Sequence, residues 1–89
     1  MIYITYDMKK IELSELTDDV NYTKYREISK LKHLQGRFIA YQSGMIVYIG
    51  YNKETLDKIA EKVNRMISDD PILIIKVGTN SQYYLKKNQ

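Results

Sequence analysis

Cysteine and tryptophan are absent from this chain of 89 residues, and histidine and proline occur once each. The lack of cysteine excludes disulfides, thiolate zinc sites and thiol nucleophiles together. The single histidine, His33, stands between Lys32 and Leu34, and we interpret it as a solvated residue near a helix end. The four glycines form neither a G-x-G-x-x-G fingerprint nor a P-loop. We therefore expect a protein that is not an enzyme, with no catalytic residue, no metal site and no cofactor.

Long hydrophobic runs are also missing, since the longest uncharged apolar run, Met45–Ile49, is far short of a membrane span. Met1–Asp7 has neither the basic start nor the length of a signal peptide. These features predict a cytoplasmic protein without a membrane partner, and no motif indicates a small-molecule substrate. Isoleucine and lysine are abundant, a composition that favours an archaeon or an archaeal virus from a hot environment.

The carboxylates give one exception to the non-enzymatic expectation. Most of them, such as Asp18-Asp19 and Asp69-Asp70, stand at predicted caps and loops, where solvated acids are ordinary. Metal binding or general acid chemistry needs carboxylates that converge in a pocket. Asp7, at the end of the first predicted strand, is the most placeable single carboxylate, as a turn former or as part of a metal-dependent nuclease.

Apolar periodicity predicts a single α+β domain over residues 1–86, followed by a disordered tail at 87–89. A short strand through Ile11 and Leu13 is a further possibility. The order β-α-β-β-α-β is that of a ferredoxin-like fold, here a small two-layer sandwich with both helices on one face and an extra C-terminal edge strand. The expected elements are a strand over Ile2–Met8, a helix over 22–34, a hairpin of Arg37–Gln42 and Met45–Tyr51, a helix over 53–68, a strand over Ile72–Val77 and the edge strand Gln82–Lys86.

The last of the core strands, Ile72–Val77, is nearly all apolar. Such a run is typical of a strand that is covered on both faces. The hairpin turns at Ser43-Gly44, and regular pairing across a two-residue loop sets Gln42 opposite Met45 and Phe38 opposite Ile49.

One face of the predicted hairpin is apolar and bears tyrosines. An apolar sheet surface on a small domain is a partner site or a dimer seam. The competing explanation, which the pattern leaves equally open, is that the first helix covers this face internally. The main functional hypothesis is a non-enzymatic binding module that contacts a larger protein or a second copy. Its predicted contact residues are Ile39, Tyr41, Ile46 and Tyr48.

Positive charge concentrates in one segment of a chain whose net charge is +3. Basic clusters beside tyrosines are one mark of nucleic-acid binding, and a solvated helix face is the simpler explanation. The alternative functional hypothesis is therefore a small nucleic-acid-binding protein. Its predicted contact residues in segment 24–37 are Lys24, Arg26, Lys30, Lys32 and Arg37.

About half of the chain, residues 34–77, resembles a small archaeal domain family of unknown function. The family pattern is a glycine, a basic residue, an aromatic and V/I-A, then a glycine turn, a V-x-x-G strand, an amphipathic helix and P-x-L-x-x-K-V. The resemblance implies ββαβ packing and supplies no catalytic residue. The matching residues are Gly36-Arg37-Phe38-Ile39-Ala40, Ser43-Gly44, Val47-Tyr48-Ile49-Gly50, the helix 53–68 and Pro71–Val77.

Overall fold

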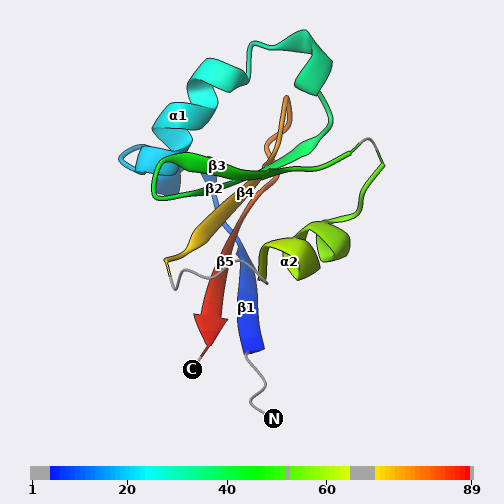
Figure 1. Cartoon of the computed structure of the whole chain (residues 1–89). Coiled ribbons are helices and arrows are strands. Elements are labelled where there is room, and N and C mark those ends of the chain that lie inside the picture. The colour runs from blue at the N-terminus through cyan, green and yellow to red at the C-terminus, as the bar shows by residue number, and fades with distance from the viewer. Residues whose placement is uncertain (1–4, 52, 65–69, 89) are drawn as a thin grey trace.

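A computed structural model describes residues 5–51, 53–64 and 70–88 of the chain. The described part is an α+β fold, as the sequence predicts, with one antiparallel sheet in the order β1-β5-β4-β2-β3 (Figure 1). The elements in chain order are β1 (Thr5–Lys10), the 3-10 turn η1 (Leu13–Leu16), α1 (Val20–Ile28), the 3-10 turn η2 (Lys32–Leu34), β2 (Phe38–Gln42), β3 (Met45–Ile49), α2 (Leu56–Asn64), β4 (Ile72–Lys76) and β5 (Gln82–Asn88).

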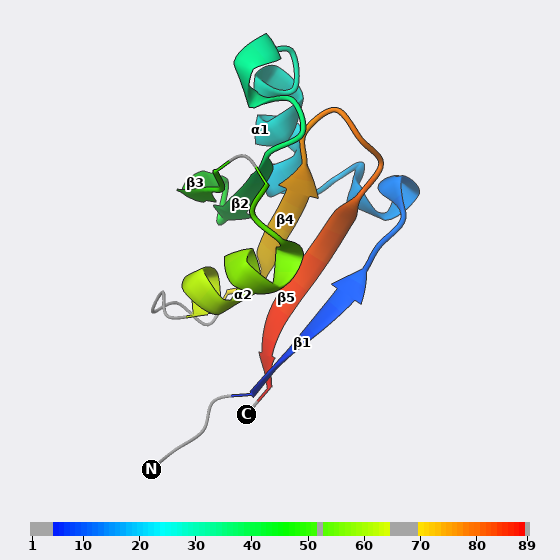
Figure 2. The same cartoon turned by 90° about the vertical axis from the view of Figure 1, so that its right-hand side faces the viewer.

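The strand order differs from the predicted ferredoxin-like arrangement, in which the first strand lies inside the sheet. Here β1 is an edge strand and pairs only with β5 among the described strands. The predicted edge strand, β5, instead lies between β1 and β4 (Figure 2). It continues through Asn88, which pairs with Thr5, so residues 87 and 88 belong to the sheet and not to a tail.

The two α-helices pack on opposite faces of the sheet, and the predicted two-layer sandwich is wrong on this point. In Figure 1, α1 lies above the β2–β3 hairpin and α2 lies below it. Neighbouring residues of β4 therefore enter different cores: Ile75 packs in the cluster of Tyr25 from α1, and Ile74 packs in the cluster of Ile59 from α2. The prediction that this strand is covered on both faces is confirmed.

The β2–β3 hairpin carries a bulge that the sequence pattern did not predict. Its turn residues, Ser43 and Gly44, have φ values of 53° and 79°, which suits a tight hairpin turn. Gln42 pairs with Met45 as predicted, but the register shifts between Ala40 and Tyr41, where β3 has one extra residue. The residues of β3 after the bulge thus lie on the face opposite to the predicted one.

Helix α1 is shorter than the predicted helix 22–34. It begins after Asp19, whose Oδ1 accepts from the backbone N–H of Asn21 at 2.7 Å and of Tyr22 at 3.4 Å. It ends at Ile28, and the separate turn η2 then carries Leu34 into the core. The apolar side chains of the predicted helix recur at every third residue: Tyr22, Tyr25, Ile28, Leu31 and Leu34. This spacing drifts around a helix of 3.6 residues per turn, so a single continuous helix could not bury all five.

The segment before α1 is ordered but is not a strand. η1 occupies the place of the predicted second strand through Ile11 and Leu13. Ile11 and Leu16 are buried in the α1-side core, whereas Leu13 is exposed. Of the helix predicted over 53–68, the structure describes α2 at Leu56–Asn64, and residues 65–69 lie outside the described residues, as do residues 1–4 of the first predicted strand.

Candidate functional site

The four predicted contact residues do not form one open surface. Ile39 and Tyr41 are 0% exposed and lie in the core beneath α1. Because of the bulge, Tyr48 pairs with Ala40 and packs on the α2 side of the sheet. Only Ile46 is exposed, at 41%. Coverage by the first helix therefore accounts for Ile39 and Tyr41, and these residues are not available to a partner.

The exposed apolar surface lies instead along β3, the other edge of the sheet. Met45 and Tyr51 are each 69% exposed, and Ile49 is 38% exposed. Beyond β2, no other described strand pairs with β3, so its outward backbone groups face solvent. Edge strands usually carry charges or proline that prevent further pairing, and residues 45–51 contain neither. This uncharged run is visible in the sequence, but it predicted an apolar sheet face and not an exposed sheet edge.

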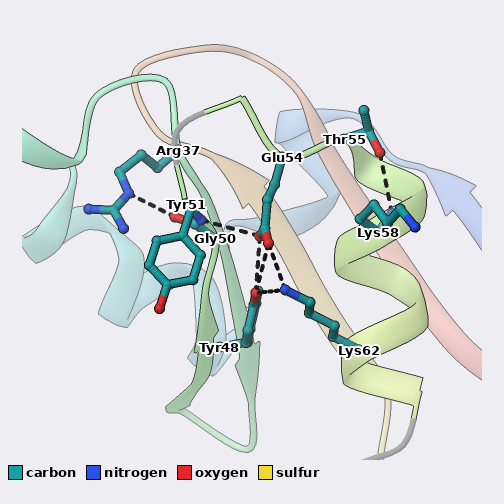
Figure 3. Close-up of polar contacts among 8 residues, drawn as sticks. All are labelled: Arg37, Tyr48, Gly50, Tyr51, Glu54, Thr55, Lys58 and Lys62. Carbon is teal, nitrogen blue, oxygen red and sulfur yellow. Dashed lines mark hydrogen bonds and ion pairs between the residues drawn. The ribbon is translucent and has the colours of Figure 1, made fainter.

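A polar cluster stands beside this edge and joins β3 to α2 (Figure 3). The Glu54 carboxylate accepts from the Tyr48 hydroxyl at 3.0 and 3.1 Å, and from the Tyr51 backbone N–H at 3.2 Å. Lys62 Nζ donates to Glu54 Oε1 at 2.7 Å and to the Tyr48 hydroxyl oxygen at 2.8 Å. The same ammonium lies 5.2 Å from the centre of the Tyr48 ring, a favourable cation–π distance. The cluster thus holds the Tyr48 side chain and the Tyr51 backbone in place.

The electrostatics of the cluster favour two fixed charges. The hydrogen bond to Lys62 is the main cause that lowers the pKa of Glu54, and the bonds to Glu54 and then Tyr48 raise the pKa of Lys62. A nucleophilic lysine needs a lowered pKa, and a general base works best near the operating pH. The pKa of Lys62 is raised and the pKa of Glu54 is lowered, which is the opposite of both requirements. The cluster therefore supports a positioning role.

The Glu54 contact predicts a specific acid sensitivity. Its folded-state pKa is below the unfolded one, so the contact stabilises the fold at neutral pH and loses this effect as the pH falls through the folded value. We expect urea unfolding of Glu54→Gln to change less between pH 7 and pH 3 than that of the unsubstituted protein. Glu27→Gln, an exposed change on α1, is the control and should follow the unsubstituted protein. Equal pH responses of the two variants would contradict the prediction.

The predicted basic residues are mostly exposed but spread over several elements. Lys24 and Arg26 lie on α1, separated by about 200° around the helix axis. Lys30 and Lys32 are exposed after α1 and in η2. Arg37 is half-buried, and its Nε donates to the Gly50 carbonyl at 2.7 Å, so this guanidinium ties β2 to the end of β3.

The two remaining residues considered for catalysis or metal binding, His33 and Asp7, lie on different elements. His33 is exposed in η2, as interpreted, and Asp7 lies on β1 opposite Lys86. Within 5–51, 53–64 and 70–88, no three His, Asp or Glu side chains are placed to hold a metal ion. Neither described α-helix has the length and apolar composition of a membrane-crossing segment.

Comparison with known proteins gives no relative from which a role could be inferred. No protein-family model, no curated protein and no solved structure matches the chain. The archaeal resemblance over residues 34–77 therefore stays a prediction.

Proposed function

We propose that this chain is a non-enzymatic binding module that associates with a second copy of itself through the β3 edge. The observation that supports the proposal is an uncharged edge strand with exposed Met45, Ile46 and Ile49. An open edge binds another strand through main-chain hydrogen bonds, and the alternate side chains supply specificity. The cluster of Glu54, Lys62 and Tyr48 holds the end of this strand against α2, so the edge is already ordered before binding.

The bulged register of β3 favours a second copy of the chain as the partner that binds this edge. Ile46 pairs with Tyr41 and Ile49 pairs with Ile39, so both exposed isoleucines lie on the α1 face. Antiparallel pairing about a two-fold axis between Val47 and Tyr48 sets Ile46 opposite Ile49 of the second copy, on the same face. A strand without charge opposes no like charges in such a symmetric, self-complementary interface.

The size of the edge limits the expected affinity. β3 has five residues, and one strand pair of that length buries less than the roughly 1,200–2,000 Å² of a stable interface. We therefore expect a weak dimer that forms as the protein concentration rises. A larger partner protein would use the same edge and compete with dimerisation.

Charge on the edge should abolish self-association. We expect the double variant Ile46→Lys, Ile49→Lys to sediment as a monomer at concentrations where the unsubstituted protein dimerises, because the like charges then face each other across the two-fold axis. Its far-UV circular dichroism should be unchanged, since both positions are exposed. Analytical ultracentrifugation over a concentration series makes the measurement.

The matched control introduces two lysines at exposed apolar positions away from the β3 edge. Leu13 and Leu31 are exposed apolar residues in η1 and just before η2, and Leu13→Lys with Leu31→Lys should leave the dimer intact. An unsubstituted protein that stays monomeric into the millimolar range, or equal losses in both double variants, would contradict the proposal.

Nucleic-acid binding through segment 24–37 has weaker support. Arg37 is engaged with Gly50, and Lys24 and Arg26 diverge around α1. A phosphate backbone needs several cations on one surface, and these positions do not supply one.

A further inference from the structure

Among the described residues, the two most exposed large apolar side chains stand at the two ends of β3. Met45 begins the strand and Tyr51 follows its end by two residues, and each is 69% exposed. Scattered exposed apolar residues are normal on a protein surface. Two of them at both ends of an open, uncharged edge, however, suit a two-fold interface, in which each end of the strand meets the other end of the second copy.

The bulge gives β3 a face pattern that is the same in both directions. Val47 and Tyr48 at its centre both pack on the α2 side of the sheet. Ile46 and Ile49 flank them on the α1 face. Met45, one residue before Ile46, returns to the α2 face because side chains of a strand alternate. A strand without the bulge would not have this symmetry, since its two central neighbours would lie on opposite faces.

Gly50 completes the pattern at the far end of the strand. Its backbone N–H donates to the Phe38 carbonyl at 2.7 Å, so Gly50 still lies beside β2, and alternation along the ladder turns the backbone groups of Ile49 to the open side. A side chain at Gly50 would point to the α2 side, where a Cβ atom would lie 2.7 Å from Ile59 Cδ1. The chain's own packing therefore requires glycine at this position.

These faces select one register for two antiparallel copies. With the two-fold axis between Val47 and Tyr48, every opposed pair shares a face, and Met45 of one copy lies opposite Gly50 of the other. An axis at Tyr48 sets Val47 opposite Ile49, and an axis between Tyr48 and Ile49 opposes these two residues, so both mix the faces. A shift of register moves side chains to the wrong side of the sheet, which disfavours these alternatives.

The surface opposite Met45 is aromatic. Gly50 is buried and has no side chain, so the Met45 side chain of one copy meets the neighbours of Gly50 in the other, Tyr48 and Tyr51. Both rings border the same ammonium group: Lys62 Nζ lies 5.2 Å from the centre of the Tyr48 ring and 6.0 Å from that of Tyr51 (Figure 3). A methionine thioether packs favourably on aromatic rings. The large residue at one end of β3 thus faces a position without a side chain at the other end.

We propose that Met45 of each copy packs on Tyr51 of the second copy across Gly50, and that this contact determines both the register of the dimer and the choice of partner. The inference rests on the self-association proposed above and names the residues that make it specific. Two such contacts form in each dimer, one at each end of the paired strands. A foreign strand with a bulky residue opposite Met45 cannot form them, because that side chain would occupy the space of the methionine.

Alanine at position 45 should weaken the dimer without affecting the fold. We expect Met45→Ala to raise the dimer dissociation constant about tenfold by analytical ultracentrifugation, which corresponds to about 1.4 kcal/mol divided between two symmetric contacts. Its circular dichroism should match that of the unsubstituted protein, because Met45 is exposed in the single copy. Leu31→Ala, an exposed apolar truncation just before η2, is the control and should leave the dissociation constant unchanged.

A double-variant cycle tests the contact between Met45 and Tyr51. Tyr51→Ala should weaken the dimer to a similar degree, since it removes the other side of the same contact. The combined Met45→Ala, Tyr51→Ala variant should then lose clearly less than the roughly hundredfold of two independent changes. Met45→Ala with Leu31→Ala should lose no more than Met45→Ala alone.

NMR spectroscopy observes the contact directly. Mixed dimers of copies with isotope-labelled methionine methyl groups and unlabelled copies should show an intermolecular nuclear Overhauser effect from the Met45 methyl group to the Tyr51 ring. The Met45 signal is identified by its loss in Met45→Ala.

Engineered cysteines report the register, because the chain has none of its own. In the proposed register Ile46 of one copy lies opposite Ile49 of the second, within the roughly 4.4–6.8 Å between Cα atoms that a disulfide spans. A mixture of Ile46→Cys and Ile49→Cys copies should therefore form a mixed disulfide on mild oxidation. Each variant alone should not, because identical residues of the two copies are then about 10 Å apart along the strands.

The outcomes separate this inference from the dimer itself. If Ile46→Lys with Ile49→Lys abolishes association but Met45→Ala leaves the affinity unchanged, or the Overhauser effect is absent from the dimer, the inference is overturned and the edge dimer stands. Disulfides that form equally well in each cysteine variant alone would overturn the register. An unsubstituted protein that stays monomeric into the millimolar range would overturn both proposals.

Discussion

Replacing Tyr41 with serine should remove a large part of the protein's stability, about 3–5 kcal/mol. The Tyr41 side chain is fully buried, and its ring meets that of Tyr25 edge-on with 6.3 Å between the ring centres. Truncation of a buried aromatic costs about 3–5 kcal/mol, and a small domain has only about 5–15 kcal/mol of stability in total. Urea unfolding followed by circular dichroism measures the loss, with Tyr51→Ser as the exposed control, which should change stability by less than about 0.5 kcal/mol.

Phenylalanine at the same position should have the opposite effect. The Tyr41 hydroxyl is buried and makes no hydrogen bond with any described group, and an unpaired buried hydroxyl costs about 1–3 kcal/mol. Tyr41→Phe keeps the ring and removes that cost, so we expect a gain of about 1 kcal/mol. A destabilised Tyr41→Phe would show that the hydroxyl has a partner, and a stable Tyr41→Ser would show that the ring is not part of the core.

The Tyr41 hydroxyl also makes the stability of the fold sensitive to high pH. Burial, with a smaller contribution from Tyr25, raises the pKa of Tyr41 to about 12, above the value near 10 of an unfolded tyrosine. Because the folded value is the higher one, this contribution is fully present below pH 10 and is lost as the pH rises from 10 to 12. Between pH 9 and pH 11, the unsubstituted protein should therefore lose more stability than Tyr41→Phe.

Alanine at Ile74 and at Ile75 should destabilise the protein to a similar degree. The two side chains are 0% and 1% exposed and belong to the separate cores on the two sides of the sheet. Each truncation should cost about 2–5 kcal/mol. In a two-layer sandwich only one of two neighbouring strand residues is buried by a helix, so the pair of variants tests the architecture directly.

Ile49→Ala is the matched control for this pair. It is also an isoleucine in a strand, but its side chain is 38% exposed on the sheet edge, and we expect a loss of about 1 kcal/mol or less. The three variants can be compared by urea unfolding at pH 7. A large loss at only one of the two β4 positions would contradict the packing of helices on both faces.

One sequence pattern indicates that both faces of the sheet are covered, although both helices were predicted to lie on one face. The apolar run Ile72–Val77 predicts a strand that is covered on both faces, which requires a helix on each side. The element order nevertheless favoured both helices on one face. The place of β1 beside β5 is a pairing of residues about 80 positions apart, and no local periodicity encodes the partner of a strand.

The candidate site shows the same division between local and long-range information. The turn at Ser43-Gly44 and the strands around it followed from turn chemistry and alternation. One extra residue in β3 then moved Tyr48 to the α2 face and Ile49 to the α1 face, where Ile46 already lay as predicted. Bulges depend on packing against both neighbouring layers, which no local pattern specifies. The other two residues of the predicted surface, Ile39 and Tyr41, are core residues because α1 covers them.

The pairing of Thr5 with Asn88 gives the sheet a particular mechanical response. The start of β1 and the end of β5 lie side by side at the same end of the molecule in both views (Figures 1 and 2). Hydrogen bonds of an antiparallel pair run perpendicular to the strands, so tension between these two residues acts along the bonds and breaks them one pair at a time. Stretched from these positions, the protein would lose β1 at low force by peeling, while β4, held between two cores, would yield last.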